Sequence, residues 1–259
     1  MVSRAVRSPP HLQSYVLHRY DWSESSLILD LFTREQGRLA VAAKGAKRPY
    51  SQMRAVLLPF QQVHAVLSRP RRGAEDEAPP EVQTLRAAEW AGGAAMLTGA
   101  ALFAGFHCNE LLMKLLARGD PHPLLFDAYA QTLPELAAAD DAKAQAALRA
   151  FELVLLREIG LLPDLGLVTA TQRALREDGA FALRPDAGVV QAGAGDPGLP
   201  GGVLIAAQAA LDVGSLAALR EVCAAALPGF KATLRTLLAY HLGTPTLRTR
   251  QVMLDLQSL

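Results

Sequence analysis

Alternating hydrophobic and polar residues near the start of the chain predict three short strands. They cover residues 14–20, 27–32 and 38–44. Because side chains alternate across a strand, Leu39, Val41 and Ala43 of the third strand point to one face. Arg38 and Lys44 point to the other. We therefore expect a strand with one apolar face and one small, basic face.

Two further apolar segments complete the pattern of a small barrel. They cover residues 56–68 and 81–90, and a charged loop rich in Pro and Gly separates them. In the first of them, Pro59 favours a bend or an edge position. Five short antiparallel strands in about eighty residues are typical of an OB-fold β-barrel, and an SH3-like barrel fits the pattern almost as well.

From Gly92 onward, Ala and Leu recur at helical spacing. We expect helices over residues 96–117, 123–138, 142–159, 215–227 and 230–242, a short hairpin at 181–191, and a basic tail around Arg248 and Arg250. The sequence thus predicts an α+β protein of three parts. They are a flexible leader (1–13), a barrel domain (14–91), and a mainly α-helical C-terminal domain (92–259) with a short irregular or β insertion near 179–206.

The composition is that of a globular protein with a sizeable core. The chain has 259 residues, 51% of them hydrophobic, and a formal net charge of +1. Its two cysteines, Cys108 and Cys223, cannot build a disulfide framework or a cysteine-based zinc site. The N-terminus has no apolar core of signal-peptide length, and no later run is long and uncharged enough to span a bilayer. We therefore expect a cytoplasmic protein with no membrane partner.

Residues 36–74 contain no Asp or Glu but carry eight positive charges. These are Arg38, Lys44, Lys47, Arg48, Arg54, Arg69, Arg71 and Arg72. A folded domain tolerates such mutual repulsion more readily when an anionic partner binds there. Gly45 lets the backbone approach a phosphate, and Tyr50 and Phe32 are candidate stacking platforms for bases. We predict a nucleic-acid-binding groove, with a merely solvated basic face as the alternative.

Enzyme chemistry finds little support in the sequence. His107 and Cys108 are adjacent, but neighbours on a helix point about 100° apart and cannot form a nucleophile–base pair. The glycine motifs of phosphate loops and dinucleotide sites are absent. We therefore predict no catalytic residue, no metal and no cofactor.

Arg149, Leu153 and Leu156 fall on one face of the helix predicted over residues 142–159. One positive charge beside apolar groups suits an acidic, hydrophobic peptide end. The alternative, which the spacing alone favours, is an arginine that snorkels at the rim of the core.

Short segments in a fixed order resemble the RecO family of bacterial recombination mediators. In the barrel region they are YVLH at 15–18, WSESSL at 22–27, LFTREQGR at 31–38, AKGAK at 43–47, LPF at 58–60 and TLRAAE at 84–89. In the helical region they are NELL at 109–112, LFDAY at 125–129, LRAFEL at 148–153 and LRTR at 247–250. The resemblance covers nearly the whole chain.

The resemblance implies an OB-fold that binds single- and double-stranded DNA, followed by a helical domain. It implies a non-enzymatic, nucleoid-associated mediator that anneals complementary single strands in DNA repair by homologous recombination. With RecR, such a protein helps to load recombinase onto strands coated by single-strand-binding protein. An adaptor whose barrel binds a partner protein instead of DNA is the alternative.

The resemblance also bears on two positions in the helical region. Arg149 matches the arginine of the family's site for the acidic C-terminal tail of single-strand-binding protein, which implies a site of Arg149, Leu153 and Leu156. Some members carry four zinc-binding cysteines after a Gly-Leu-Leu-Pro-type segment, whereas residues 168–179 contain none. We therefore expect the 179–202 region to hold its shape by packing or to remain mobile.

Overall fold

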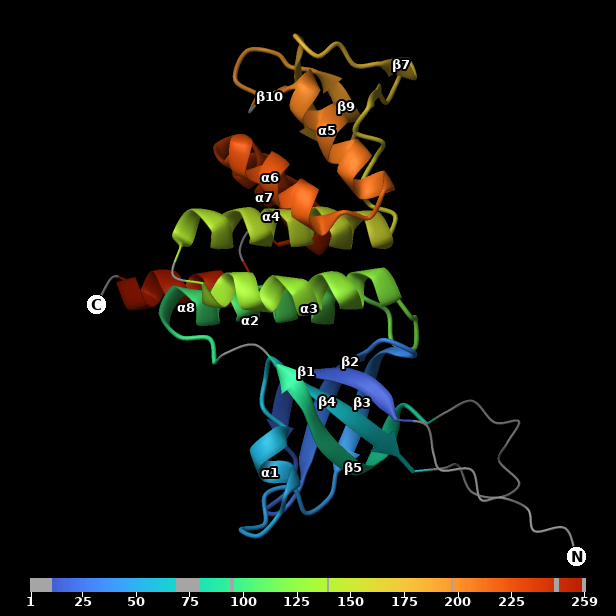
Figure 1. The fold of residues 1–259 in the computed structure, drawn as a ribbon, viewed down its shortest axis with the longest axis vertical. Helices are drawn as coiled ribbons and strands as arrows, with labels where there is room; N and C mark the ends of the chain where they lie inside the picture. Colours follow the sequence, from blue (N-terminus) through green and yellow to red (C-terminus); the bar gives the residue numbers. More distant parts are fainter. Residues whose placement is uncertain are drawn as a thin grey trace, which may run out of the picture. The chain divides into compact units, whose positions relative to one another are not determined.

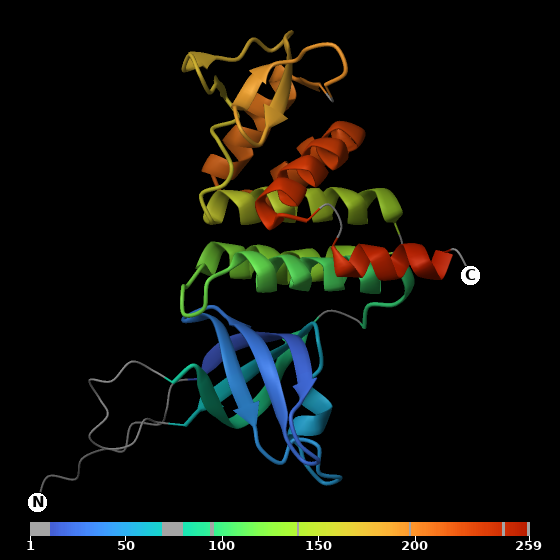
Figure 2. The same cartoon turned by 180° about the vertical axis from the view of Figure 1, so that it is seen from behind.

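A computed structural model of the chain describes residues 11–68, 80–93, 96–138, 140–196, 198–244 and 247–257. Internal contacts divide the chain into two compact units, a barrel unit and a helical unit (Figures 1 and 2). The barrel unit comprises Met1–Ala94 and Leu116–Pro123, and the helical unit comprises Ala95–Leu115 and Leu124–Leu259. Residues 116–123 thus belong with the barrel, although the sequence predicts them inside the helical domain.

Five strands close into a barrel in the order β1–β2–β3–β5–β4. They are β1 (Leu12–Asp21), β2 (Leu27–Thr33), β3 (Gly37–Ala43), β4 (Gln61–Leu67) and β5 (Val82–Gly93). Neighbouring strands are antiparallel except β3 and β5, which run parallel. A closed five-stranded barrel with this connectivity confirms the predicted OB type.

The hydrophobic alternation in β2 and β3 builds the barrel core. Leu29 pairs with Val41 and Leu31 with Leu39 across the two strands, so their side chains share one face. All four belong to one buried cluster. A slip of one residue would turn this whole set outward, so burial also specifies the register.

Two boundaries in the barrel differ from the prediction. Strand β1 begins at Leu12, inside the predicted leader, of which residues 1–10 lie outside the described part of the chain. A short helix, α1 (Met53–Val56), precedes β4, so the fourth strand starts at Gln61 and not at residue 56. Apolar composition alone does not distinguish one helical turn from the start of a strand.

The β2–β3 hairpin is held by the segment 116–123. Gly119 donates its N–H to the carbonyl oxygen of Arg38 (3.0 Å). Gly37 has a φ of +68°, and a Cβ added there would collide with the backbone of Asp120. Glycine is therefore required at this position on two grounds, conformation and close approach.

The helical unit contains seven helices in its described residues. They are α2 (Gly99–Leu115), α3 (Pro123–Ala137), α4 (Asp141–Glu158), α5 (Gly201–Asp212), α6 (Leu216–Ala225), α7 (Leu227–Leu242) and α8 (Arg248–Gln257). Helix α4 packs against α2, α6 and α7, and its residues Phe151, Leu153, Leu155 and Leu156 are fully buried. Within the described ranges, no single helix has the length and hydropathy to cross a bilayer; α6 and α7 meet that test only as a pair bent by 106°.

Two of these helices were not predicted. Helix α5 begins at Gly201, where the sequence predicts an irregular or β insertion up to residue 206, and α8 occupies the predicted basic tail. Glycines in the first turn conceal the start of α5, which is otherwise a good helical sequence. Helix α8 begins with the polar run Arg248, Thr249, Arg250 and Gln251, which reads in the sequence as a basic tail.

A small β region lies between α4 and α5. It consists of β6 (Leu167–Val168), β7 (Arg173–Ala174), β8 (Ala180–Arg184), β9 (Gly188–Gln191) and β10 (Leu199–Pro200). Phe181, Leu183 and Val189 are buried within it. Arg184 forms an ion pair with Asp196 at 2.9 Å. In the described chain, no three His, Cys, Asp or Glu side chains are placed to hold a metal ion.

Candidate nucleic-acid interface and peptide pocket

Two loops of the barrel unit meet at one end of the barrel. One is the β1–β2 turn (22–26). The other follows β3 and runs into the start of α1 (44–54). Figure 1 shows this end of the barrel beside α1. Lys47 joins them, because its backbone N–H donates to the carbonyl of Ser25 (3.0 Å) and its Nζ to that of Ser23 (2.9 Å). Its Nζ also lies 3.2 Å from a carboxylate oxygen of Asp21. We call residues 22–26 and 44–54 the loop cluster.

The loop cluster presents more positive than negative charge. Lys44, Arg48 and Arg54 are exposed, and none has an ion-pair partner within the described part of the chain. Asp21 is engaged by Lys47, which leaves Glu24 as the cluster's one acidic residue. Three other cations of the predicted basic groove lie outside the described residues and stay predictions: Arg69, Arg71 and Arg72.

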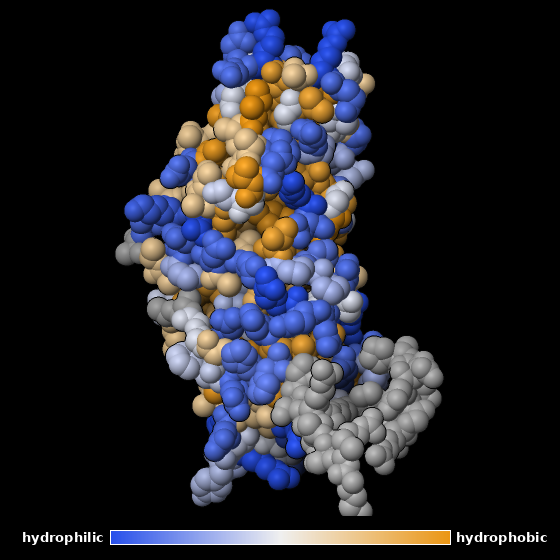
Figure 3. Space-filling model, turned by 45° about the vertical axis from the view of Figure 1, so that its right-hand side comes forward, coloured by the Kyte–Doolittle hydropathy of each residue, from blue (hydrophilic) through white to orange (hydrophobic). Residues whose placement is uncertain are grey.

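Two large aromatic side chains of the loop cluster are open to solvent. Tyr50 is 99% exposed and Trp22 is 72% exposed. On the face that Figure 3 shows, the described part of the barrel is mostly hydrophilic. Phe32, the other predicted stacking platform, has no exposed surface, so that prediction is wrong. Sequence reasoning missed Trp22, whose signal was a large aromatic inside a polar turn.

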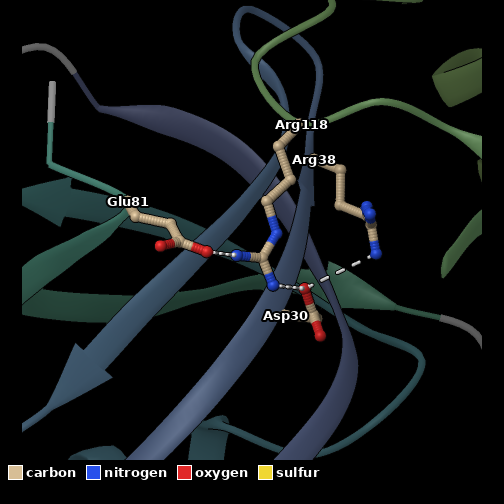
Figure 4. Close-up of polar contacts among 4 residues, drawn as sticks. All are labelled: Asp30, Arg38, Glu81 and Arg118. Carbon is tan, nitrogen blue, oxygen red and sulfur yellow. Dashed lines mark hydrogen bonds and ion pairs between the residues drawn. The ribbon is translucent and has the colours of Figure 1, made fainter. Parts of the chain in front are cut away.

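Arg38 lies on the face of β3 opposite the core, as the alternation predicts, but its charge is engaged (Figure 4). The buried carboxylate of Asp30, only 5% exposed, lies 3.9 Å from Arg38 and 3.8 Å from Arg118. Arg118 also reaches Glu81 at 3.4 Å. Burial, the negative charge of Asp30 and a hydrogen bond to it raise the pKa of Tyr20. Arg38 therefore differs from the three exposed cations of the loop cluster.

The helical unit contains an open pocket of about 310 Å³ between α2, α4, α7 and α8. Its apolar lining includes Phe103, Leu148, Leu238, Leu242, Leu247 and Met253. Its basic lining consists of Arg149, Lys231, Arg235 and Arg250. Apolar walls with a few charged groups are the usual composition of a small-ligand or peptide-end site.

Arg149 is fixed in this pocket by a buried acid. Its side chain lies at the rim of the core, 7% exposed, with Nη1 2.8 Å from an oxygen of Glu152. The other oxygen of Glu152 lies 2.8 Å from Nε2 of His107. Leu153 and Leu156, predicted beside Arg149 in the site, are completely buried in the core and do not line the pocket. Leu148, the neighbour of Arg149, lines the pocket instead of these two leucines. The long side chain of Arg149 reaches the pocket from the rim of the core, whereas Leu153 and Leu156 point into the core.

The two cysteines do not have the character of catalytic thiols. Cys108 and Cys223 are both fully buried. Burial raises the pKa of each thiol, that of Cys223 to about 12, so both are protonated at neutral pH. Reactive cysteines show the opposite shift.

One wall of the pocket, α8, is attached through Glu110 of α2. The Glu110 carboxylate accepts hydrogen bonds from the backbone N–H of Arg248 (2.9 Å) and of Thr249 (2.9 Å), and from the Thr249 hydroxyl (2.7 Å). Lys114 is its ion-pair partner at 3.2 Å. Burial alone would raise the pKa of Glu110, but these hydrogen bonds outweigh it and lower the pKa. A carboxylate in this position satisfies free N–H groups at the start of a helix.

Comparison with known proteins agrees with this architecture. The sequence matches the family model "Recombination protein O N terminal" over residues 11–76 and "Recombination protein O C terminal" over residues 96–251.

The chain is also similar to several proteins named DNA repair protein RecO, three of them from Polaromonas sp., Albidiferax ferrireducens and Variovorax paradoxus. The relative from Polaromonas sp. is 50% identical over 263 residues and 100% of both chains. That from Albidiferax ferrireducens is 48% identical over 261 residues, 100% of this chain and 99% of the relative. That from Variovorax paradoxus is 49% identical over 265 residues, 98% of this chain and 99% of the relative. The chain therefore belongs to the RecO family, whose members are non-enzymatic recombination mediators in DNA repair.

Proposed function

We propose that this protein binds DNA through the loop cluster, anneals complementary single strands, and helps to load recombinase onto strands coated by single-strand-binding protein. The observation that carries the proposal is a group of exposed cations on an OB-type barrel that have no ion-pair partner among the described residues: Lys44, Arg48 and Arg54. RecR as a partner rests on membership of the family. The site of action is the cytoplasm, at the nucleoid.

The charge arrangement supports phosphate binding by the loop cluster. Each phosphate neutralised by Lys or Arg releases condensed counterions, which strengthens binding at low salt. A cation without a partner binds a phosphate without first breaking an ion pair. Lys47 contributes less, because its Nζ already contacts Asp21 and Ser23. Arg38 contributes least, since Asp30 balances its charge.

A triple substitution tests this assignment. We expect Lys44→Ala with Arg48→Ala and Arg54→Ala to weaken binding of a single-stranded oligonucleotide at least tenfold, as measured by fluorescence anisotropy of the full chain. The control is matched in the number of charges and removes three exposed cations from the helical unit: Lys143 and Arg176, which pair with Asp140 and Asp178, and Arg173. Equal losses in the two triple variants would assign the effect to net charge, and the loop cluster would then not be the site.

The pocket of the helical unit supports recruitment of an acidic, hydrophobic peptide end. Its four cations complement the negative charge of such a tail, and its leucine and phenylalanine walls accept an apolar terminal side chain. Arg149 is held at a fixed place by Glu152, which also balances part of its charge, so the exposed Lys231 and Arg235 supply further positive charge beside it for the tail. We propose that this tail is the C-terminus of single-strand-binding protein.

The test of the pocket avoids Arg149 itself, because reversing its charge beside buried Glu152 would disturb the fold. We expect Lys231→Glu with Arg235→Glu, two exposed pocket residues, to abolish binding of a labelled acidic tail peptide and to spare binding of bare DNA. Arg173→Glu with Arg176→Glu is the matched control. Retained peptide binding in the pocket variant would refute the assignment.

Annealing is tested with the same variants. Complementary strands coated by single-strand-binding protein require both sites, whereas bare strands require the loop cluster alone. We therefore expect the pocket variant to anneal bare strands normally and coated strands slowly. A pocket variant that anneals coated strands at the wild-type rate would contradict the proposed division of labour.

A further inference from the structure

We infer that Trp22 and Tyr50 stack on unpaired bases, so that the loop cluster binds single-stranded DNA in preference to duplex DNA; this rests on the proposed function. Both rings are exposed and belong to the loop cluster, whose two loops are joined by the contacts of Lys47 to Ser23 and Ser25. Single exposed aromatics are common on proteins, but two of them in the same loop cluster as Lys44, Arg48 and Arg54, which have no ion-pair partner among the described residues, match the composition of single-strand binding sites.

The loops that carry the two rings are ordered before any ligand binds. In the β1–β2 turn, Trp22 and Ser23 both donate their N–H to the carbonyl of Ser26 (3.3 Å each). In the next loop, Arg48 donates to the carbonyl of Gly45 (3.1 Å). Together with the contacts of Lys47 to the turn, these bonds preorganise both loops, which lowers the entropic cost of stacking.

The two kinds of side chain in the loop cluster recognise different parts of a nucleic acid. Phosphates are present on single and double strands, so Lys44, Arg48 and Arg54 attract both. The faces of paired bases are covered by their neighbours in a duplex and are free only in a single strand. Stacking on Trp22 and Tyr50 therefore adds affinity for the single strand alone. Because every base has a π-face, this preference should tolerate any sequence.

Trp90 provides a matched control within the same barrel. It is 63% exposed and lies on β5, outside the loop cluster. Its indole N–H donates to the side-chain oxygen of Gln61 (3.2 Å). If an exposed tryptophan affected DNA binding only through its hydrophobic surface, removing Trp90 would weaken binding as much as removing Trp22.

The experiment compares three full-length proteins at one salt concentration: wild type, Trp22→Ala with Tyr50→Ala, and Trp90→Ala. Binding of a labelled oligothymidylate and of a labelled mixed-sequence duplex is measured by anisotropy. We expect the double variant to lose about tenfold or more in affinity for the single strand and less than about twofold for the duplex. The Trp90→Ala variant should match wild type on both.

Tryptophan fluorescence gives a second measurement that does not depend on truncation. In Trp90→Phe, Trp22 is the sole tryptophan, since the chain has two. We expect its emission to be quenched by the single strand and much less by the duplex. No quenching, or equal losses on both DNA forms in the double variant, would overturn the inference.

The outcomes separate the inference from the proposed function. If wild type binds both DNA forms with the expected salt dependence but the double variant behaves like wild type, stacking is refuted and phosphate binding stands. If wild type binds neither DNA form, the stacking inference and the proposed DNA binding are both refuted.

Discussion

The loop cluster of the barrel and the pocket of the helical unit are both basic, yet they hold their cations in opposite ways. Lys44, Arg48 and Arg54 are exposed and have no acidic partner in the described chain. Arg149 is largely buried and is tied to Glu152, which is itself fully buried. The loop cluster thus presents exposed charge, which suits the long polyanion proposed for it, whereas the pocket holds one charge in place, which suits the proposed short acidic end.

This difference predicts how each region responds to substitution. Removing a free, exposed cation should change binding and leave the free energy of unfolding nearly unchanged. Removing one member of a buried pair should destabilise the fold, because the remaining charge has no partner. Binding and stability should therefore separate at the loop cluster and be coupled at the buried Arg149–Glu152 pair of the pocket.

The largest effect is expected for Glu152→Ala. This change leaves Arg149 and His107 beside a buried vacancy without their common acid, and we expect it to lower the free energy of unfolding by about 3–5 kcal/mol. Urea unfolding of the full chain measures this. Asp178→Ala is the matched control, because Asp178 pairs with Arg176 on the surface and its loss should leave stability unchanged. Equal stability of the two variants would contradict the proposed role of Glu152.

A smaller effect, with a second consequence, is expected for Asp30→Asn. The neutral side chain still fills the buried site but no longer balances Arg38 and Arg118. We expect a loss of about 1–3 kcal/mol in the free energy of unfolding. At the same time two cations are released, so DNA affinity at low salt should rise. Unchanged stability together with unchanged affinity would show that the pairs at 3.8–3.9 Å carry no energy.

The smallest effect is expected at Glu110, as a dependence on pH. The pKa of this group is lowered in the folded protein, so its contribution to stability is complete above the ordinary glutamate value of 4.5. That contribution is lost as the pH falls through the lower, folded-state pKa. We expect Glu110→Gln to cost about 1 kcal/mol at neutral pH and to reduce the acid sensitivity of unfolding. Parallel pH profiles of wild type and variant would contradict this.

Elements that a local pattern of apolar or charged residues indicates were predictable from the sequence. Alternation in the strands predicted at residues 27–32 and 38–44 indicated both strands and the apolar face of Leu39, Val41 and Ala43, all of which are buried. Repeated Ala and Leu indicated five of the seven helices in the described part of the helical unit. The acid-free window likewise indicated the exposed cations of the loop cluster.

Features that depend on contacts across the chain were not predictable in this way. Asp30 lies outside the acid-free window, yet the β2–β3 register places it diagonally from Arg38 on the same face, where it balances that charge. The pocket takes its walls from four helices, so no local spacing reveals it. The attachment of α8 joins Glu110 to Thr249, which are 139 residues apart.

The central claim is that free cations of the loop cluster neutralise DNA phosphates. The most direct test is the slope of log affinity against log salt for a single-stranded oligonucleotide, measured for wild type and for the triple variant at Lys44, Arg48 and Arg54. With about 0.7 per phosphate on a single strand, the slope of the triple variant should be smaller by about two. The matched triple variant at Lys143, Arg173 and Arg176 should keep the wild-type slope. A loop-cluster variant whose slope equals that of wild type would contradict the account.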